Sequence, residues 1–205
     1  MLRHPHYIRY MTGHFLSSFL GSVQYTISTD TMIQTAGHIS QENSAGISAG
    51  MNYMGKDILG QLGGMSISNK IGKYSDTDRL PYFKGLMGLY QISLLAETAT
   101  FMVGSTQGFV VTAGLANIGK NVAFTGFGSI TANVIPEIVA KDSRKNGEVY
   151  TKINIVGSLA SSLGMSVGVG MIWLVPDPHE RMGLGLAVGL CKYAVMRWGL
   201  EGVYL

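Results

Sequence analysis

One apolar stretch dominates the hydropathy pattern of the chain. No Asp, Glu, Lys or Arg lies between Lys152 and Asp177, and a helix needs roughly 20 apolar residues to cross the hydrocarbon core of a bilayer. The segment 136–148 before it carries the densest charge in the sequence, and Pro176 and Pro178 follow it. The pattern therefore predicts a membrane helix over 150–175, with a charged hinge before it and a proline stop after it.

Four further apolar segments predict long helices, separated by polar or glycine-rich connections. Gly37 suits the C-terminal end of the first of these helices, and Pro81 suits the first turn of the third. The C-terminal segment has only a short apolar core before Lys192, so we expect a peripheral or re-entrant helix there. The predicted helices are 7–36, 45–71, 82–103, 109–134 and 150–175, with the peripheral helix at 181–200.

Small residues recur four positions apart in several of these helices. Glycine is a poor helix former in water, but it lets helix backbones approach closely in membranes. Residues four apart share a helix face, so each series predicts a surface on which a neighbouring helix packs, and the series within 150–175 is the longest. We assign this packing role to Gly13, Ser17, Gly21, Gly60, Gly64, Ser158, Ser162, Ser166 and Gly170.

Composition agrees with a membrane protein. Charged residues make up 13% of the 205 residues, about half the share typical of a soluble domain. The expected fold class is therefore an all-α, polytopic membrane helical bundle of about four to six helices in a single domain, 1–205. The net charge of +3, without a basic run interleaved with aromatic residues, argues against a nucleic-acid partner.

The N-terminal segment suggests a cellular location. It contains Arg3, Arg9 and several hydroxyl residues, but no acidic residue before Asp30. This is the composition of a mitochondrial targeting helix, so we expect the mitochondrial inner membrane or, failing that, another intracellular membrane. Cys191 is the only cysteine, which excludes a disulfide within the chain.

Motifs of enzymes and cofactor sites are missing from the sequence. The five histidines are scattered through termini and loops and do not have the spacing of a metal site. Gly183, Gly185 and Gly189 resemble a dinucleotide fingerprint only superficially, because the spacing is wrong and no strand precedes them. We therefore expect a protein that is not an enzyme and has no cofactor or metal.

Four charges interrupt the apolar helices. Lys56 and Asp57, Glu97, and Lys120 lie in three successive predicted helices. Ionisable groups at membrane depth are costly and usually face the bundle interior in pairs. We expect Lys120 to pair with Asp57 or Glu97 and so to lock these helices together. The alternative is a polar path for a small solute or a proton.

Several short motifs resemble those of one family. Residues 52–63 read NYMGKDILGQLG, 76–83 read DTDRLPYF, 116–121 read ANIGKN and 133–143 read NVIPEIVAKDS. In this order they are similar to motifs of the root UVB-sensitive (RUS) family, also called the vitamin B6 photo-protection and homoeostasis family. The resemblance covers about residues 7–170, and the chain is truncated relative to typical members, whose C-terminal region is missing here.

The resemblance implies a membrane-associated protein linked to development and vitamin handling, without an established reaction. Independently of the resemblance, we expect Glu137, Lys141 and Asp142 in the charged hinge to set the entry angle of the following helix through salt bridges at the membrane surface. The resemblance adds candidate site residues to Lys56, Asp57 and Lys120, namely the signature residues Asn133, Glu137, Lys141 and Asp142.

Two classes of function stay open. The small-residue surfaces exceed what one short bundle needs, which favours a non-catalytic structural or accessory subunit of a mitochondrial inner-membrane complex, of the respiratory chain or ATP synthase. Its partners would be other membrane subunits and membrane lipids. The alternative is a small membrane carrier or a vitamin-B6-linked homoeostasis protein that uses a polar intramembrane path.

Overall fold

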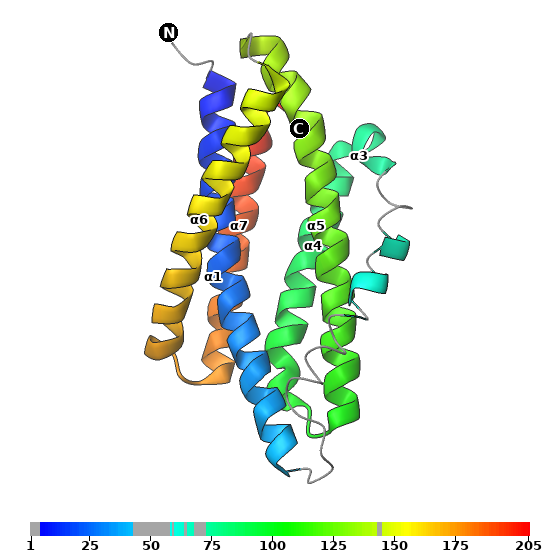
Figure 1. Cartoon of the computed structure of the whole chain (residues 1–205), viewed down its shortest axis with the longest axis vertical. Helices are drawn as coiled ribbons and strands as arrows, with labels where there is room; N and C mark the ends of the chain where they lie inside the picture. Colours follow the sequence, from blue (N-terminus) through cyan, green and yellow to red (C-terminus); the bar gives the residue numbers. More distant parts are fainter. Residues whose placement is uncertain (1–4, 43–57, 59, 64, 68–72, 143–144) are drawn as a thin grey trace.

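The computed structural model describes residues 5–42, 58, 60–63, 65–67, 73–142 and 145–205, with the backbone alone for 40–42 and 141–142. Over these residues the chain is all-α, as predicted, and has no strand. Its long helices run side by side along the long axis (Figure 1). The elements are α1 (Pro5–Glu42), α3 (Tyr74–Thr77), α4 (Arg79–Thr98), the 3₁₀ helix η1 (Ala99–Met102), α5 (Thr106–Asp142), α6 (Asn146–Leu174) and α7 (Pro178–Leu200).

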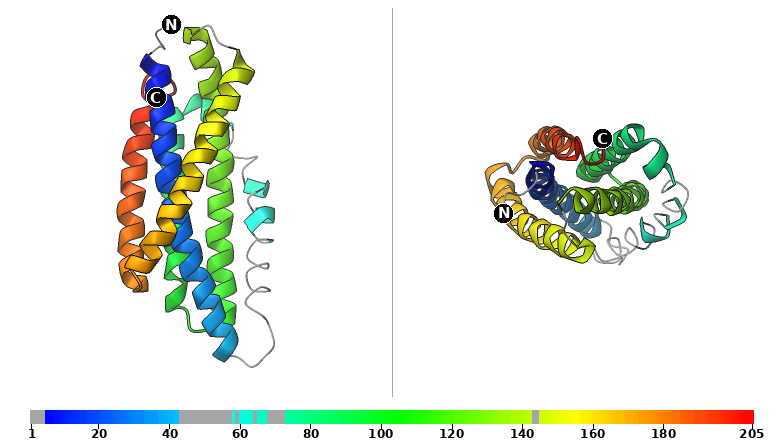
Figure 2. Two further views of the ribbon diagram at one scale, coloured as in Figure 1. Left: turned by 60° about the vertical axis from the view of Figure 1, so that its left-hand side comes forward. Right: turned by 90° about the horizontal axis from the view of Figure 1, so that it is seen from above.

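The first helix, α1, lies at the centre of the arrangement. It packs most extensively along α6 and α7 and also contacts α4 and α5. Seen from above, α1 lies between α6 and α7, and α4 and α5 lie together beside these three helices (Figure 2). α4 and α5 are antiparallel neighbours joined through η1 and a short loop.

α5 is longer than predicted, because it continues through Pro136 to Asp142. The first half of the predicted hinge is therefore helical. Proline removes one backbone hydrogen bond and usually kinks or ends a helix. Here Val134, Ile135 and Ile138 beside the proline are buried in the main apolar core, and this burial holds the last turns of α5 in place.

The predicted helix 45–71 lies largely outside the described residues, together with Lys56, Asp57 and Gly64. Its described parts, 60–63 and 65–67, are helical and lie beside α5. A Cβ placed on Gly60 would overlap the side chain of Asn117, so Gly60 sits at a close contact between segments, in keeping with the packing role assigned to it.

The last helix, α7, is not the peripheral helix that its short apolar core predicted. It has 23 residues and packs along α1 and against α4. The closest approach joins Gly13 of α1 and Gly199 of α7, where a Cβ placed on Gly13 would lie 2.6 Å from Gly199 Cα. The hydropathy pattern did not predict that α7 is an integral helix of the bundle, because Arg181 and Lys192 look like surface charges in the sequence. Both residues are buried in the structure.

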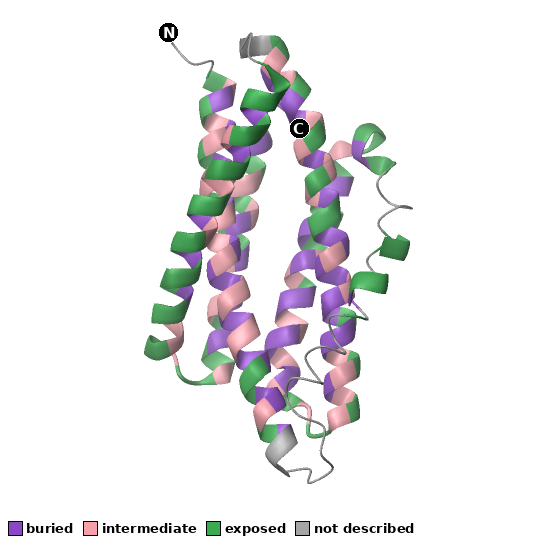
Figure 3. Ribbon diagram, viewed as in Figure 1, coloured by how far each residue is buried: buried purple, intermediate pink, exposed green. Residues whose placement is uncertain are grey.

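α6 turns most of its surface outward (Figure 3). Its buried positions include Ala160, Gly164 and Gly168, and a Cβ placed on Gly168 would lie 2.7 Å from Thr26 Cβ of α1. The predicted packing series is on another face, so that prediction is wrong within this chain. Periodicity alone could not tell which of two small-residue faces points inward. The exposed series is Ser158, Ser162, Ser166 and Gly170.

Two of the described helices are long and apolar enough to cross a membrane. They are Thr106–Ala140 of α5, with 39% of its most apolar window buried, and Asn146–Leu174 of α6, with 17%. α5 is therefore partly a core helix, whereas the apolar surface of α6 is left largely uncovered by the other described residues.

The C-terminal turn closes one end of the bundle. Tyr204 Oη donates a hydrogen bond to the Ser75 carbonyl oxygen at 2.6 Å, and the Arg79 guanidinium lies 5.3 Å from the centroid of the Tyr204 ring. Burial raises the pKa of Tyr204 to about 12, so the phenol remains protonated, and able to donate, at neutral pH.

Candidate functional site

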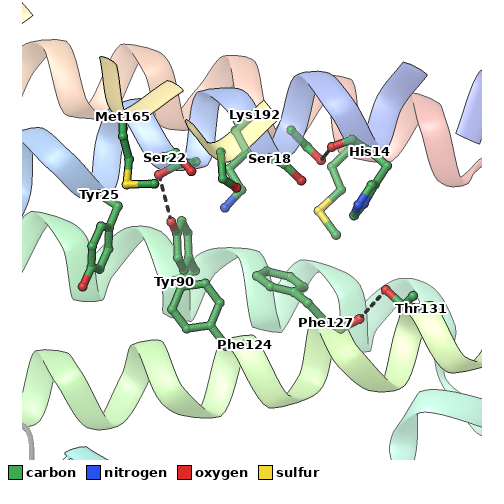
Figure 4. A pocket seen from close by; sticks show the side chains of 14 residues that line it. His14, Ser18, Ser22, Tyr25, Tyr90, Phe124, Phe127, Thr131, Met165 and Lys192 are labelled. Atoms are coloured by element: carbon green, nitrogen blue, oxygen red, sulfur yellow. Dashed lines mark hydrogen bonds between the residues drawn. The ribbon is translucent and has the colours of Figure 1, made fainter. Parts of the chain in front are cut away.

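A cavity of about 460 Å³ lies between the helices (Figure 4). Residues from α1, α4, α5, α6 and α7 all contribute to its wall, so the cavity exists only when these five helices are assembled. Its volume lies within the range of about 300–1,000 Å³ that is usual for small-molecule sites.

Lys192 of α7 is the most unusual group in the wall. The residue is only 6% exposed, and no carboxylate of the described residues forms an ion pair with it. Its Nζ lies 3.5 Å from the centroid of the Tyr90 ring and 5.6 Å from that of Phe127. These rings stabilise the cation in part, but a buried ammonium without a counter-charge is costly.

A glycine on α1 makes room for this amine. A Cβ placed on Gly21 would lie 2.8 Å from Lys192 Nζ, so a larger side chain at that position would displace the amine. The sequence predicted that Gly21 packs against a neighbouring helix. In the structure, its neighbour is the Lys192 side chain of α7. The Gly21 carbonyl oxygen also accepts a hydrogen bond of 3.4 Å from Tyr90 Oη, which orients the ring under the amine.

Aromatic rings form the wall contributed by α4 and α5. Tyr90 meets Phe124 and Phe127 edge to face, with ring centroids 5.5 and 6.0 Å apart. Such a cluster offers flat apolar surfaces to a planar ring. Figure 4 shows Tyr90 and Phe127 on the side of the cavity that faces Lys192.

The wall contributed by α1 and α6 is polar. Ser18, Ser22 and Ser161 bring hydroxyl groups to it. His14 stacks on Tyr10 with a centroid distance of 5.9 Å, and a Cβ placed on Gly157 would lie 2.8 Å from His14 Nε2. A shallower depression between α1 and α6 shares His14, Ser18, Ser161 and Met165 with the cavity, which places a route to the surface on this side.

The predicted ion pair lies just beyond the cavity. Lys120 Nζ is 2.5 Å from Glu97 Oε1, and both side chains are buried. Ser28 Oγ donates to Glu97 Oε2 at 3.1 Å, and Lys120 Nζ lies 4.9 Å from the centroid of Tyr25, which also lines the cavity. The expected pairing of Lys120 with Glu97 is therefore present and ties α4 to α5, with a contact to α1.

Two further polar layers escaped sequence reasoning. Gln24 Nε2 donates to Gln91 Oε1 at 2.6 Å and to the Gly185 carbonyl oxygen at 2.9 Å, which links α1, α4 and α7. At the end of the bundle, Arg181 Nη1 lies 2.8 Å from Asp30 Oδ2 and its guanidinium also donates to carbonyls near the end of α6. The signal for the first layer was a lone glutamine in each of two apolar segments, whereas Arg181 follows Asp177, His179 and Glu180 and carried no such signal.

The two signature residues whose side chains the structure describes, Asn133 and Glu137, do not line the cavity. Asn133 Nδ2 donates to Asp76 Oδ1 at 2.6 Å and ties α5 to α3. Glu137 is half-buried, and the side chains of Lys141 and Asp142 lie outside the described residues. Among the predicted site residues that the structure describes, only Ser17 and Gly21 are in the cavity wall. Lys192 was not predicted as a site residue, because in the sequence it only marks the end of a short apolar segment.

The described residues contain no group of three or more His, Cys, Asp or Glu that could hold a metal ion. The site is therefore defined by an amine, aromatic rings and hydroxyl groups. These groups suit a small planar molecule with polar substituents, which the rings would cover and the hydroxyl groups and the amine would orient.

One comparison with known proteins finds a match, and it is to a family model. The family model described as the vitamin B6 photo-protection and homoeostasis domain matches residues 4–198. No curated protein and no solved structure matches the chain. The matched residues include the whole wall of the cavity.

Proposed function

The chain belongs to the vitamin B6 photo-protection and homoeostasis family, and from this premise we propose that it is a non-catalytic membrane protein that binds a form of vitamin B6 in the cavity between its helices. The observation that carries the proposal is the buried Lys192, which lines a cavity of small-molecule size without a carboxylate partner among the described residues. Burying an amine without a counter-charge during folding costs free energy, and this cost favours a role for Lys192 in ligand binding.

The chemistry of the vitamin fits the two walls. Forms of vitamin B6 are substituted pyridines that carry a ring hydroxyl and hydroxymethyl groups. The rings of Tyr90, Phe124 and Phe127 offer surfaces on which a pyridine can stack. The hydroxyl groups of Ser18 and Ser22 on the opposite wall are hydrogen-bond partners for the substituents.

We place the protein in a membrane because of the outward face of α6. Leu159, Leu163 and Val167 are among its exposed apolar side chains, and the helix carries no charge after Lys152. A soluble monomer rarely exposes an apolar surface of this extent. The N-terminal composition makes the mitochondrial inner membrane the proposed location.

The binding proposal is tested with two matched substitutions on α6. Ser161 lines the cavity, whereas Ser166 is exposed on the outer face. We expect Ser161→Phe to fill the cavity and reduce binding of labelled pyridoxine by at least about tenfold, equivalent to about 1.4 kcal/mol. Ser166→Phe should bind like the unchanged protein. The measurement is equilibrium dialysis of the full chain in detergent micelles.

Either of two results would contradict the proposal. The first is an unchanged protein that binds no form of vitamin B6 in micelles or in bilayers. The second is equal binding by the two phenylalanine variants, because the ligand would then sit outside the cavity. Circular dichroism of each variant checks that the helices are formed.

A second candidate function is the accessory subunit of a mitochondrial inner-membrane complex. The observation that favours it is the exposed series Ser158, Ser162, Ser166 and Gly170, because small residues on an outer face allow a partner helix to approach closely. Native protein extracted in mild detergent would then co-migrate with respiratory-chain or ATP-synthase subunits. If the protein instead migrates without partners, near its own mass of 22.0 kDa, this function is excluded.

The ion pair of Glu97 and Lys120 bears on the carrier alternative. A polar path needs groups that a solute can reach, whereas both of these side chains are buried and face each other. The pair therefore supports a structural role between α4 and α5, and Lys192 is the charge that lines the cavity. A carrier built on this chain would use the cavity and its opening between α1 and α6.

A further inference from the structure

Lys192 can do more than orient a ligand. A lysine that is buried in an apolar pocket is the usual nucleophile for reversible capture of aldehydes, because the neutral amine attacks the carbonyl carbon. Among the forms of vitamin B6, only pyridoxal and its phosphate carry an aldehyde. The identity of the bound form can therefore be argued from this side chain, and the argument rests on the function proposed above.

The surroundings of the amine satisfy the geometric needs of such a reaction. Lys192 lines the cavity, and its Nζ occupies the space that a side chain at position 21 would otherwise fill. Its close neighbours are the rings of Tyr90 and Phe127. No described carboxylate holds it in an ion pair, in contrast to Lys120, whose Nζ lies 2.5 Å from Glu97.

We propose that Lys192 forms a covalent imine with the aldehyde of pyridoxal, so that the protein captures this form of vitamin B6 selectively. The amine nitrogen bonds to the aldehyde carbon, and the carbonyl oxygen leaves as water with the two amine hydrogens. No oxidant or reductant is needed. Hydrolysis by one water reverses the step, returns the free lysine and releases pyridoxal unchanged.

The wall favours pyridoxal over pyridoxal phosphate. A phosphate carries about two negative charges at neutral pH and usually binds to arginine or to a helix N-terminus. No arginine of the described residues lines the cavity, and Lys192, the one described lysine in its wall, would be consumed by the imine. The hydroxyl groups of Ser18 and Ser22 are suited to the neutral hydroxymethyl group of pyridoxal.

The decisive experiment locates the bond. The purified full chain in detergent micelles is incubated with substoichiometric pyridoxal and reduced with borohydride, which converts an imine into a stable secondary amine. Peptide mass spectrometry then measures labelling at each lysine. We expect Lys192 to be labelled at least about tenfold more than Lys152 and Lys84, which are exposed or half-exposed and report the background reactivity of surface amines.

Binding measurements add a second readout. The unchanged protein should bind pyridoxal at least about tenfold more tightly than pyridoxine, which has the same ring but no aldehyde. Lys192→Met should remove this preference while pyridoxine still binds. Gly21→Ala keeps the lysine but displaces its amine, so it should reduce labelling at Lys192 even if the methionine variant fails to fold.

The outcomes separate the two proposals. If pyridoxal and pyridoxine bind equally and label spreads over surface lysines, the imine is wrong, although the binding function stands. If no form of vitamin B6 binds, the binding function fails with it. If pyridoxal phosphate labels Lys192 as well as pyridoxal does, the choice of the unphosphorylated form is overturned.

Discussion

At the residue scale, two buried lysines among the described residues are in opposite situations. Lys120 faces Glu97 at 2.5 Å, whereas Lys192 has aromatic neighbours and no described carboxylate. The sequence could predict the first, because lone opposite charges in neighbouring apolar helices are expected to pair. It could not predict the second, since the role of Lys192 depends on a cavity that five helices build together.

The buried pair should be costly to break. Lys120→Met leaves the Glu97 carboxylate buried without its partner, so we expect the free energy of unfolding to fall by about 3–5 kcal/mol. Adding Glu97→Gln in the same chain should recover a large part of this loss. Chemical denaturation in micelles, followed by tryptophan fluorescence, measures both variants.

A surface pair supplies the control for this experiment. Lys152 Nζ lies 2.5 Å from Glu148 Oε1, but both side chains are well exposed, so Lys152→Met should cost about 0.5 kcal/mol or less. Equal losses for Lys120→Met and Lys152→Met would show that burial of the Glu97–Lys120 pair does not determine its strength.

At the element scale, two glycines with the same predicted role lie in opposite surroundings. The structure places Gly13 against the backbone of α7, while a Cβ at Gly170 meets nothing within 4 Å. The sequence predicted the existence of the helices and the periodicity of their small residues. It did not predict which face of each helix points inward, because that depends on which sides of α1 pack against α6 and α7.

These two glycines allow a matched test of helix packing. Gly13→Leu must push α1 and α7 apart, since the nearest atom is a backbone Cα at 2.6 Å from the added Cβ, and we expect a loss of about 1–3 kcal/mol or more. Gly170→Leu should be neutral or stabilising, because leucine is a better helix former than glycine by up to about 1 kcal/mol. Thermal unfolding in micelles checks both, and equal melting temperatures would contradict the close approach of α1 and α7.

Helix ends and the last helix show the limits of local patterns in another way. Pro136 and the charges after it predicted a hinge, but apolar neighbours of the proline keep α5 helical to Asp142. Likewise, Arg181 is charged in the sequence but is satisfied by Asp30 and by carbonyls of α6. Tertiary contacts overrode both local signals.

At the scale of the whole molecule, the outer face of α6 decides whether lipid surrounds the bundle. We expect a tryptophan at Leu163, in the middle of this face, to be quenched by lipids brominated deep in their acyl chains. A tryptophan at Tyr150 lies about 20 Å away along the helix axis and should respond to bromines near the headgroups. Each substitution is made after Trp173 and Trp198 are replaced by phenylalanine.

Two other results of the quenching experiment are informative. If neither tryptophan is quenched by any brominated lipid, α6 does not face a bilayer and the membrane proposal fails. If Leu163→Trp is quenched in the purified chain but not in native membranes, another protein covers the face there, which would support the accessory-subunit function.

The central position of α1 has a consequence for the synthesis of the protein. α1 is made first, but its most extensive contacts are with α6 and α7, which are made last. Roughly 160 residues separate the end of α1 from the end of α7, so at about 5–20 residues per second the ribosome needs roughly 8–32 s to supply both partners. During that interval α1 depends on the insertion machinery or a chaperone, and a nascent chain that stalls before α7 cannot form the cavity.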